Sequence, residues 1–222
     1  MNRRFFFLIM LTCFASVAWG QDTNYPFVGT IEHGLSDPAT IMTLPDGSGP
    51  ALTEARQVGG AVVDATIRVR LINEYLDPIV NFPEEDLWLQ FDRGVGTATG
   101  CNHDSGYPGG FFTADGVTDW DGWTAFTLPL RGGGWSELSV HVYLLGSMAI
   151  DPNFIEFPPL PLGLVSPDIN GDLVINLTDI ALFSQDLLAP GGGHLRSDFN
   201  NDGEINLTDI ALFAQGLGST CE

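Results

Sequence analysis

DINGDLVINLTDIALFSQ occupies residues 168–185, and DFNNDGEINLTDIALFAQ occupies residues 198–215. The two stretches are copies of one sequence repeat, with an offset of 198 − 168 = 30 residues at every matching position. Self-similarity at a fixed period constrains the structure before any helix or strand is assigned. The repeat therefore predicts two copies of one small structural unit at this end of the chain.

Each copy places side-chain oxygens at alternating positions and ends on a spaced carboxylate. This is the spacing of a 12-residue calcium loop, with ligands from positions 1, 3, 5, 9 and 12 and a backbone carbonyl from position 7. The first predicted ligand set is Asp168, Asn170, Asp172, Val174 (carbonyl), Asn176 and Asp179, and the second is Asp198, Asn200, Asp202, Glu204 (carbonyl), Asn206 and Asp209. The sequence thus predicts two Ca²⁺ sites.

The two predicted loops differ at position 6, where the turn favours a residue that tolerates positive φ. The second loop has Gly203 there, but the first has Leu173, whose side chain resists that conformation. We therefore expect the first loop to be the weaker or more strained site. In both loops position 12 is Asp, one methylene shorter than the usual Glu.

A helix is predicted after each loop, because apolar residues recur at helical spacing. They are Ile180, Phe183 and Leu187 in the first copy and Ile210, Phe213 and Leu217 in the second. No helix is predicted before either loop, since proline or glycine runs stand there.

A loop followed by one helix, duplicated, resembles the dockerin family (type I-like), and residues 168–185 and 198–215 carry the resemblance. It implies one calcium ion per repeat and docking onto a cohesin-like protein or cell-surface scaffold. The family's partner contacts lie at the end of each loop, which here reads Leu177-Thr178 and Leu207-Thr208. Near-identical copies imply that a partner could bind in either of two orientations.

These stretches allow three other interpretations. Asp- and Asn-rich segments are common as plain turns, but two copies with matched ligands and helices favour calcium. Calcium could also stabilise the fold of a structural surface protein that has no docking partner. Asn176-Leu-Thr and Asn206-Leu-Thr match the glycosylation sequon, which we interpret as coincidental because both asparagines belong to the predicted loops.

Residues 1–20 read as a secretory signal peptide, with Arg3 and Arg4, then an apolar run, then Ala18-Trp19-Gly20. We expect a secreted or cell-surface protein with no membrane insertion after cleavage. Without Arg3 and Arg4, six of the eight basic residues remain against 28 acidic ones, and lysine is absent. This balance argues against binding to nucleic acid or to anionic membranes.

Two cysteines, Cys101 and Cys221, remain after the signal peptide. In an oxidising compartment they could form a disulfide, pair with another chain or stay as free thiols, and their spacing does not decide between these. We expect the intramolecular bridge.

The middle of the chain reads as short β-strands separated by Gly/Pro-rich turns. The strongest pattern is Ala61–Ile72, and further strands are expected in Asp86–Phe91, Phe111-Phe112, Gly122–Leu130, Ser139–Leu145 and Asn153–Phe157. The fold class predicted is mainly β with a small α domain, with an Ig-like β-sandwich before the repeats. The predicted domains are a signal peptide (1–20), an N-terminal extension (21–60), the sandwich (61–157), a Pro-rich linker (158–167) and the dockerin-like unit (168–222).

No catalytic residue is predicted. The candidate acids Glu84, Glu85, Asp86, Asp104, Asp115, Asp119 and Asp121 lack evidence of a facing pair, which a glycosidase needs. Dockerin-bearing chains are, by family, associated with polysaccharide degradation, so a carbohydrate-binding or carbohydrate-processing role is kept as an alternative. The aromatic residues that could stack on sugar rings are Trp88, Trp120, Trp123, Trp135, Phe111 and Phe112, although in a sandwich such residues are more often core.

Overall fold

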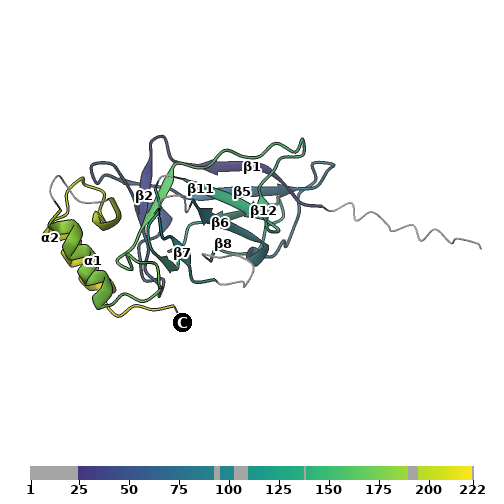
Figure 1. Cartoon of the computed structure of the whole chain (residues 1–222). Helices are drawn as coiled ribbons and strands as arrows, with labels where there is room; N and C mark the ends of the chain where they lie inside the picture. Colours follow the sequence, from purple (N-terminus) through teal and green to yellow (C-terminus); the bar gives the residue numbers. More distant parts are fainter. Residues whose placement is uncertain (1–24, 93–95, 103–109, 138, 190–194, 222) are drawn as a thin grey trace, which may run out of the picture.

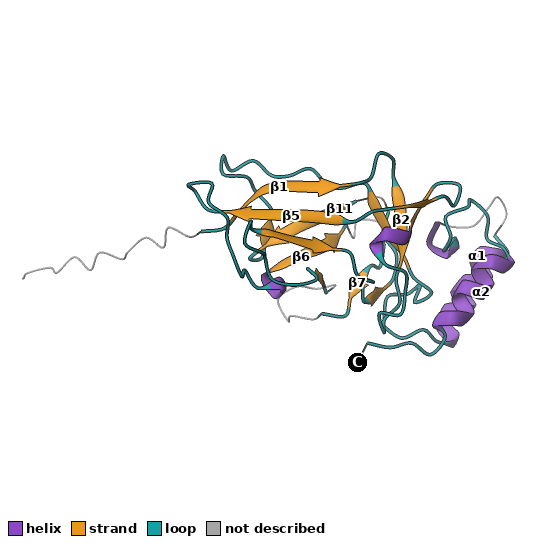
Figure 2. Ribbon diagram, turned by 180° about the vertical axis from the view of Figure 1, so that it is seen from behind, coloured by secondary structure: helices purple, strands orange, loops and turns teal. Residues whose placement is uncertain are grey.

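The computed structural model describes residues 25–92, 96–102, 110–137, 139–189 and 195–221. Within these ranges it is mainly β, with two helices near the C-terminal end, as the sequence predicts (Figures 1 and 2). The predicted signal peptide and Asp104 lie outside the described residues. Among the described residues, no helix is long and apolar enough to cross a membrane.

The strands are short and follow the turn-rich sequence. They are β1 (Phe27–His33), β2 (Ala39–Met42), β3 (Ala55–Gln57), β4 (Val62–Val63), β5 (Ile67–Ile72), β6 (Leu87–Phe91), β7 (Thr99–Gly100), β8 (Phe112–Thr113), β9 (Trp123–Phe126), β10 (Gly132–Gly133), β11 (Val140–Leu144), β12 (Ser147–Met148) and β13 (Leu162–Val165). The helices are α1 (Leu177–Leu187) and α2 (Leu207–Gly216), with short 3₁₀ turns at Leu52–Glu54, Glu84–Asp86 and Leu195–Ser197.

The strands form four sheets, ordered β1-β5-β9, β12-β11-β6-β8, β13-β2-β3-β4 and β10-β7. The strand predicted over Ala61–Ile72 is confirmed in its second half, where Ala65, Ile67, Val69 and Leu71 are fully buried. Its first half is wrong, because residues 62–63 form the separate strand β4 in another sheet. The four buried residues share one core with Leu87, Leu89, Val140 and Val142 from the second sheet and with Ile41, Leu162 and Leu164 from the third. One hydrophobic core therefore serves the three largest sheets.

Strand pairing reaches beyond the boundaries expected for the β region. Residues 27–33, expected to lie in an extension, pair along β5 as strand β1. Residues 162–165, expected to lie in a linker, form β13 and pair in parallel with β2. Parallel pairing joins segments far apart in sequence, which local patterns do not reveal. Only Ser166 and Pro167 separate β13 from the first predicted calcium loop.

One expected strand is wrong. Residues 153–157 form a turn with a single bridge, Ile150 to Glu156, because the Asp151 side chain accepts hydrogen bonds from the N–H groups of Asn153 and Ile155. Such side-chain bonding competes with a strand ladder.

A second hydrophobic core joins the β region to the helices. Met42, Leu44 and Val165 from the β side pack with Ile169, Ile175, Phe183, Phe199 and Phe213 from the repeats. The rings of Phe183, Phe199 and Phe213 lie within 5.5–6.3 Å of one another, centroid to centroid. Beside this core, the buried carboxylate of Asp186 on α1 accepts two hydrogen bonds from Arg196, one from Nε and one from Nη2, both at 2.8 Å. The repeat unit is thus packed against the β sheets.

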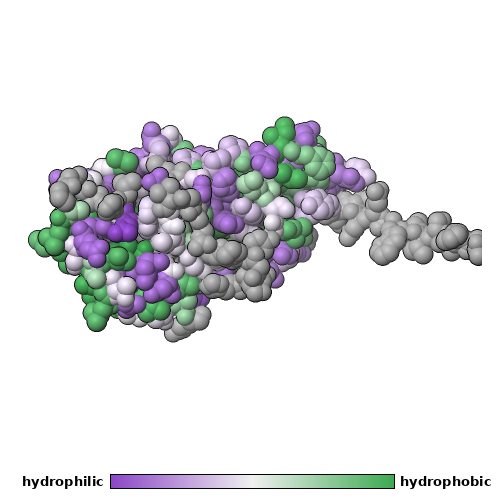
Figure 3. Space-filling model, in the orientation of Figure 1, coloured by the Kyte–Doolittle hydropathy of each residue, from purple (hydrophilic) through white to green (hydrophobic). Residues whose placement is uncertain are grey.

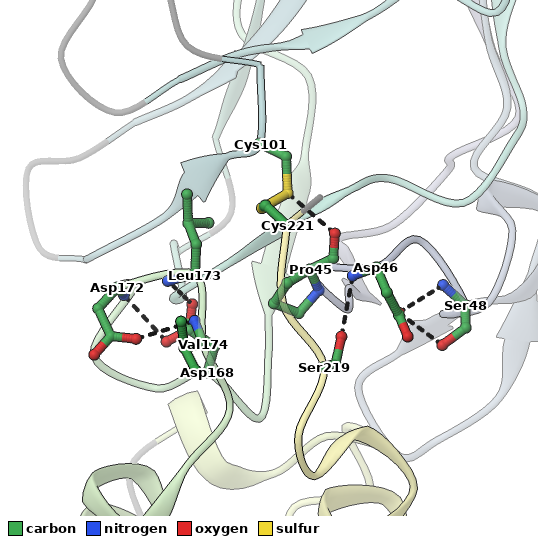
Figure 4. Close-up of a disulfide and its surroundings, with 10 residues drawn as sticks. All are labelled: Pro45, Asp46, Ser48, Cys101, Asp168, Asp172, Leu173, Val174, Ser219 and Cys221. Carbon is green, nitrogen blue, oxygen red and sulfur yellow. Dashed lines mark hydrogen bonds between the residues drawn. A yellow bond between two sulfur atoms is a disulfide. The ribbon is translucent and has the colours of Figure 1, made fainter.

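The structure also joins Cys101 to Cys221 in a disulfide, with a sequence separation of 120 (Figure 4). The segment that carries Cys221 runs back along the first loop, where Ile175 N donates to Ser219 O and Val174 bridges Thr220. Asp46 N donates to Ser219 Oγ at 3.0 Å, which ties the same segment to the β region.

Replacing both cysteines, as Cys101→Ser with Cys221→Ser, should lower the free energy of unfolding by about 2–5 kcal/mol, because the bridge restricts a long loop in the unfolded chain. Urea unfolding under oxidising conditions measures the change. The unmodified protein in reducing agent should match the double variant, whose own stability should not respond to the reductant. Equal unfolding midpoints for oxidised protein and double variant would contradict the expectation.

Candidate calcium loops

The two predicted calcium loops share most of their internal hydrogen bonds. In the first, Asp168 Oδ1 accepts from Asp172 N at 3.1 Å and Asp168 Oδ2 accepts from Leu173 N at 2.7 Å. In the second, Asp198 Oδ1 accepts from Asp202 N at 3.1 Å and Asp198 Oδ2 accepts from Gly203 N at 2.8 Å. The carboxylate at position 1 therefore draws the backbone of positions 5 and 6 toward it in each loop.

The later loop positions are matched as well. Asp172 Oδ1 accepts from Val174 N at 3.0 Å, and Asp202 Oδ1 accepts from Glu204 N at 2.9 Å. The position-12 carboxylates point back into the loops, where Asp179 accepts from Asn176 N and Asp209 accepts from Asn206 N, both at 3.0 Å.

Each helix begins at the position-9 asparagine of its loop. Asn176 Oδ1 accepts from Thr178 N and Asn206 Oδ1 accepts from Thr208 N, both at 2.8 Å. With Asp179 or Asp209 bonding back to the backbone N–H of that asparagine, each start is a capping box. The same residues thus close the loop and start the helix.

The electrostatics of the first loop suit a cation. Burial is the main cause that raises the pKa of Asp168, to about 6, and the negative charges of Asp179 and Asp172 add to it. Burial likewise raises the pKa of Asp179, Asp198 and Asp209. Carboxylates that are costly to ionise together are stabilised by a bound metal ion.

The donor chemistry also suits calcium. Each loop offers carboxylate, amide and backbone oxygens, the hard ligands that Ca²⁺ takes in sets of 6–8. Asn170 Nδ2 donates to Asp172 Oδ2 at 2.8 Å and Asn176 Nδ2 donates to Val174 O at 3.0 Å, so side-chain amides within the loop hold two of the predicted ligand oxygens. Among the described residues, no three or more His, Cys, Asp or Glu side chains gather closely enough to hold a metal ion, and this includes the three aspartates of each predicted loop.

Position 6 takes the predicted backbone conformation in both loops. Gly203 has φ +94°, and Leu173 has φ +68°, so the leucine adopts the left-handed region that favours glycine. This conformation costs a residue with a Cβ about 1–2 kcal/mol. At position 6 the first loop therefore carries strain that the second does not. At position 4 the glycine is in the first loop, Gly171 at φ +72°, and the second loop has Asn201 at φ +54°, which asparagine tolerates better than leucine does.

Both loops are seated on the β region, which the sequence did not predict. At the first loop Gly134 N donates to Asp168 O at 2.6 Å, and Thr97 Oγ1 donates to Ile169 O at 2.9 Å. At the second, Gly59 N donates to Asn201 O at 2.8 Å, and Asn201 Nδ2 donates to Arg56 O at 2.9 Å. Runs of glycine at 59–60 and 132–134 were the available signal, because glycine marks close backbone approach.

The partner-contact residues expected from the family lie open. Leu177 and Leu207 are 78% and 80% exposed, and Thr178 and Thr208 are exposed beside them. All four stand at the helix starts, away from the buried position-12 carboxylates.

The aromatic residues considered for sugar binding are not gathered in one place. Trp88 and Phe112 are buried, Phe111 and Trp135 are half-buried, and Arg68 lies over the Trp123 ring at 4.6 Å from its centroid. Trp120 differs from these in being largely open to solvent, with 84% of its surface exposed.

Comparison with protein families places the repeats in a known class. The family model of the dockerin type I domain matches residues 166–218, so the chain carries a dockerin domain at its C-terminal end. Dockerin domains dock onto cohesins and belong to a calcium-binding family of extracellular and cell-surface proteins. Comparison with curated proteins and with solved structures gives no match.

Gly133→Ala should disturb the seat of the first loop, because an added Cβ would overlap the Asp168 carboxylate. We expect a loss of about 1–3 kcal/mol in unfolding free energy, the usual cost of overpacking. Gly116→Ala is the matched control, since an added Cβ there meets nothing within 4 Å. Thermal unfolding compares the two, and equal stability of both variants would rule out a tight seat.

Exchanging the position-6 residues should exchange the strengths of the loops. Gly203→Leu places a side chain in open space but at φ +94°, so only backbone strain opposes it. A cost of about 1–2 kcal/mol corresponds to roughly 5- to 30-fold weaker Ca²⁺ binding at the second loop. Leu173→Gly should strengthen the first loop.

Calorimetric titration of each full-length variant with Ca²⁺ measures both loops. The prediction fails if Gly203→Leu leaves the tighter of two binding constants unchanged.

Proposed function

We propose that this is an exported, non-catalytic protein whose dockerin domain binds two Ca²⁺ ions and attaches the chain to a cohesin-type partner on a scaffold or cell surface. The residues that would hold the ions are the two ligand sets that begin at Asp168 and Asp198. The first loop, with its strained Leu173, would be the weaker site.

The observation that carries the proposal is the lack of charge on the exposed surfaces of α1 and α2. The only charged residues in the two helices are Asp179, Asp186 and Asp209, and all three are buried. The exposed residues are leucine, isoleucine, alanine, threonine, serine and glutamine. In a chain with a formal net charge of −20, an uncharged and partly aliphatic surface is unusual.

Figure 3 shows hydrophobic residues gathered over this helical end of the molecule. The exposed leucines at the two helix starts, Leu177 and Leu207, would supply uncharged, apolar surface of the kind that forms the core of a protein interface. Because both repeats offer the same Leu-Thr pair, one partner could use either repeat, in orientations that differ by exchange of the two.

Support for a non-catalytic role comes from the candidate acids. Asp115 accepts from Thr127 N at 2.7 Å, and Asp119 accepts from Asp121 N and Trp123 N, both at 2.9 Å. Asp119 thus shapes a backbone turn, and Asp115 ties its segment to residues 127–128, so both carboxylates have a structural role.

Calcium should be needed for docking. Full-length protein should be captured by an immobilised cohesin from a panel of type I cohesins in Ca²⁺, and chelator should abolish capture, because the loops hold the helix starts in place. Calorimetry of the same protein should show two Ca²⁺ sites. Capture that persists in chelator would contradict the proposal. Calcium binding with no capture by any cohesin would favour the purely structural role of calcium.

Binding in either of two orientations can be tested by changing the Leu-Thr pair of each repeat, first separately and then together. Leu177→Ala with Thr178→Ala should weaken binding only a few-fold, as should the same changes at 207 and 208, because the other repeat remains. All four together should weaken it at least a hundredfold. Val58→Ala, at a residue that is 76% exposed in the β region, is the control for loss of an exposed aliphatic side chain.

A further inference from the structure

A short segment after α2 runs antiparallel to the first predicted calcium loop. This C-terminal segment, residues 218–221, pairs with positions 6–8 of the loop. Ile175 at position 8 donates its N–H to Ser219 O and accepts at its own carbonyl from Gly218 N, both at 3.0 Å. The carbonyl of position 6 accepts from Cys221 N at 3.4 Å. The backbone of these loop positions is therefore hydrogen-bonded to a segment outside both repeats.

These hydrogen bonds flank the carbonyl that the first loop would give to calcium. Val174 supplies position 7, and it lies between the two loop residues that bond to the C-terminal segment. Val174 also forms a β-bridge with Thr220. Its other neighbour, Leu173, holds φ +68°, a conformation that is costly for a residue with a Cβ. Pairing on both sides of Val174 keeps this backbone in its loop conformation, so the ligand carbonyl is preorganised.

The second loop has no matching strand in the part of the chain that the structure describes. There, Gly203, Glu204 and Ile205 take part in no β-bridge. Gly203 and Glu204 are exposed, and a Cβ added to Gly203 would meet nothing within 4 Å. Glycine adopts a positive φ readily. The supporting segment is thus found at the loop whose position 6 is leucine.

The C-terminal segment is in turn fixed to the β region beside the first loop. Cys221 is bonded to Cys101, and Asp46 N donates to Ser219 Oγ at 3.0 Å (Figure 4). Cys101 directly follows β7, and Thr97, two residues before β7, donates from Oγ1 to the carbonyl of loop position 2 at 2.9 Å. The segment around β7 therefore holds the first loop twice, directly through Thr97 and indirectly through the disulfide.

We propose that the Cys101–Cys221 disulfide is a redox-sensitive support of the first calcium loop, and that its reduction weakens Ca²⁺ binding at this loop only. The inference rests on the proposed binding of Ca²⁺ by the first loop. Reduction by an external dithiol breaks the S–S bond, leaves a thiol on each cysteine and converts the dithiol to its own disulfide. The C-terminal segment then keeps only non-covalent contacts with the β region, and its pairing with the loop is less often formed.

The coupling also acts in the opposite direction. If the disulfide strengthens binding at the first loop by some factor, bound Ca²⁺ must make the disulfide harder to reduce by the same factor. Calcium and oxidation therefore stabilise the same pairing of loop and C-terminal segment.

Calorimetric titration of the full-length protein with Ca²⁺ tests the proposal. It compares the oxidised protein, the protein reduced with dithiothreitol, and the double variant Cys101→Ser with Cys221→Ser. We expect about five- to tenfold weaker binding at the first loop without the bridge, the equivalent of about one backbone hydrogen bond. Binding at the second loop should not change.

Two variant backgrounds assign the binding constants to the loops. Asn200→Ala with Asp202→Ala removes predicted ligands of the second loop, so the first is titrated alone, and Asn170→Ala with Asp172→Ala does the reverse. Leu89→Ala controls for general loss of stability, because it removes a fully buried side chain from the β core and keeps the disulfide. This control should unfold more easily and bind Ca²⁺ at the first loop as tightly as the unmodified protein.

Two further measurements do not use the calcium affinity. Hydrogen exchange in chelator follows the N–H groups of Ile175 and Gly218, which should exchange faster once the bridge is reduced. The equilibrium between the disulfide and dithiothreitol, measured with and without Ca²⁺, should shift five- to tenfold toward the disulfide when Ca²⁺ is present. That shift should disappear in the background that lacks the first loop's ligands.

Equal first-loop affinity in the oxidised, reduced and Cys-to-Ser proteins would overturn the proposal. So would an equal loss at the second loop, or exchange at Ile175 that does not respond to reduction. Absence of Ca²⁺ binding by the oxidised protein would overturn the proposed function and this inference with it. Binding at both loops that ignores the state of the cysteines would overturn this inference alone.

Discussion

The contact on which the arrangement of this protein depends is the one between Asp168 and the glycine run at 132–134. The backbone carbonyl of Asp168 accepts from Gly134, while its carboxylate lies where a side chain on Gly133 would have to stand. One residue thus belongs to two structures, because the same carboxylate that curls the first calcium loop also packs against the β region. The dockerin domain is therefore packed against the β region, and only Ser166 and Pro167 separate it from β13.

Two nearly identical repeats consequently have different surroundings. The first loop is bordered by Thr97, Gly133 and the segment that carries Cys221, and the second by Arg56 and Gly59. Their internal hydrogen bonds agree closely, which shows how far twelve residues can determine their own shape. The loops differ in their residues at positions 4 and 6 and in their neighbours, while the exposed Leu-Thr pairs remain alike.

Much of the dockerin domain could be predicted from sequence because its determinants are local. The ligand spacing, the helix starts at Asn176 and Asn206 and the positive φ at Leu173 all follow from residues within one loop. The buried face of β5 could be predicted for the same reason. Pairing of β1 with β5 and of β13 with β2, and the seat of the loops, join segments that are distant in sequence, so no local pattern contains them. The turn at 151–155 was missed because the bonding of Asp151 to the backbone outweighs the strand tendency of Phe154 and Ile155.

The disulfide between Cys101 and Cys221 has a mechanical consequence. Tension applied at the helices would enter the β region by two covalent routes, one through Ser166 and Pro167 and the other through the sulfur bridge. The hydrogen bonds that seat the loops lie between these routes and so would bear only part of the load. A domain held by two covalent connections stays joined to the β region even where the hydrogen bonds between them break.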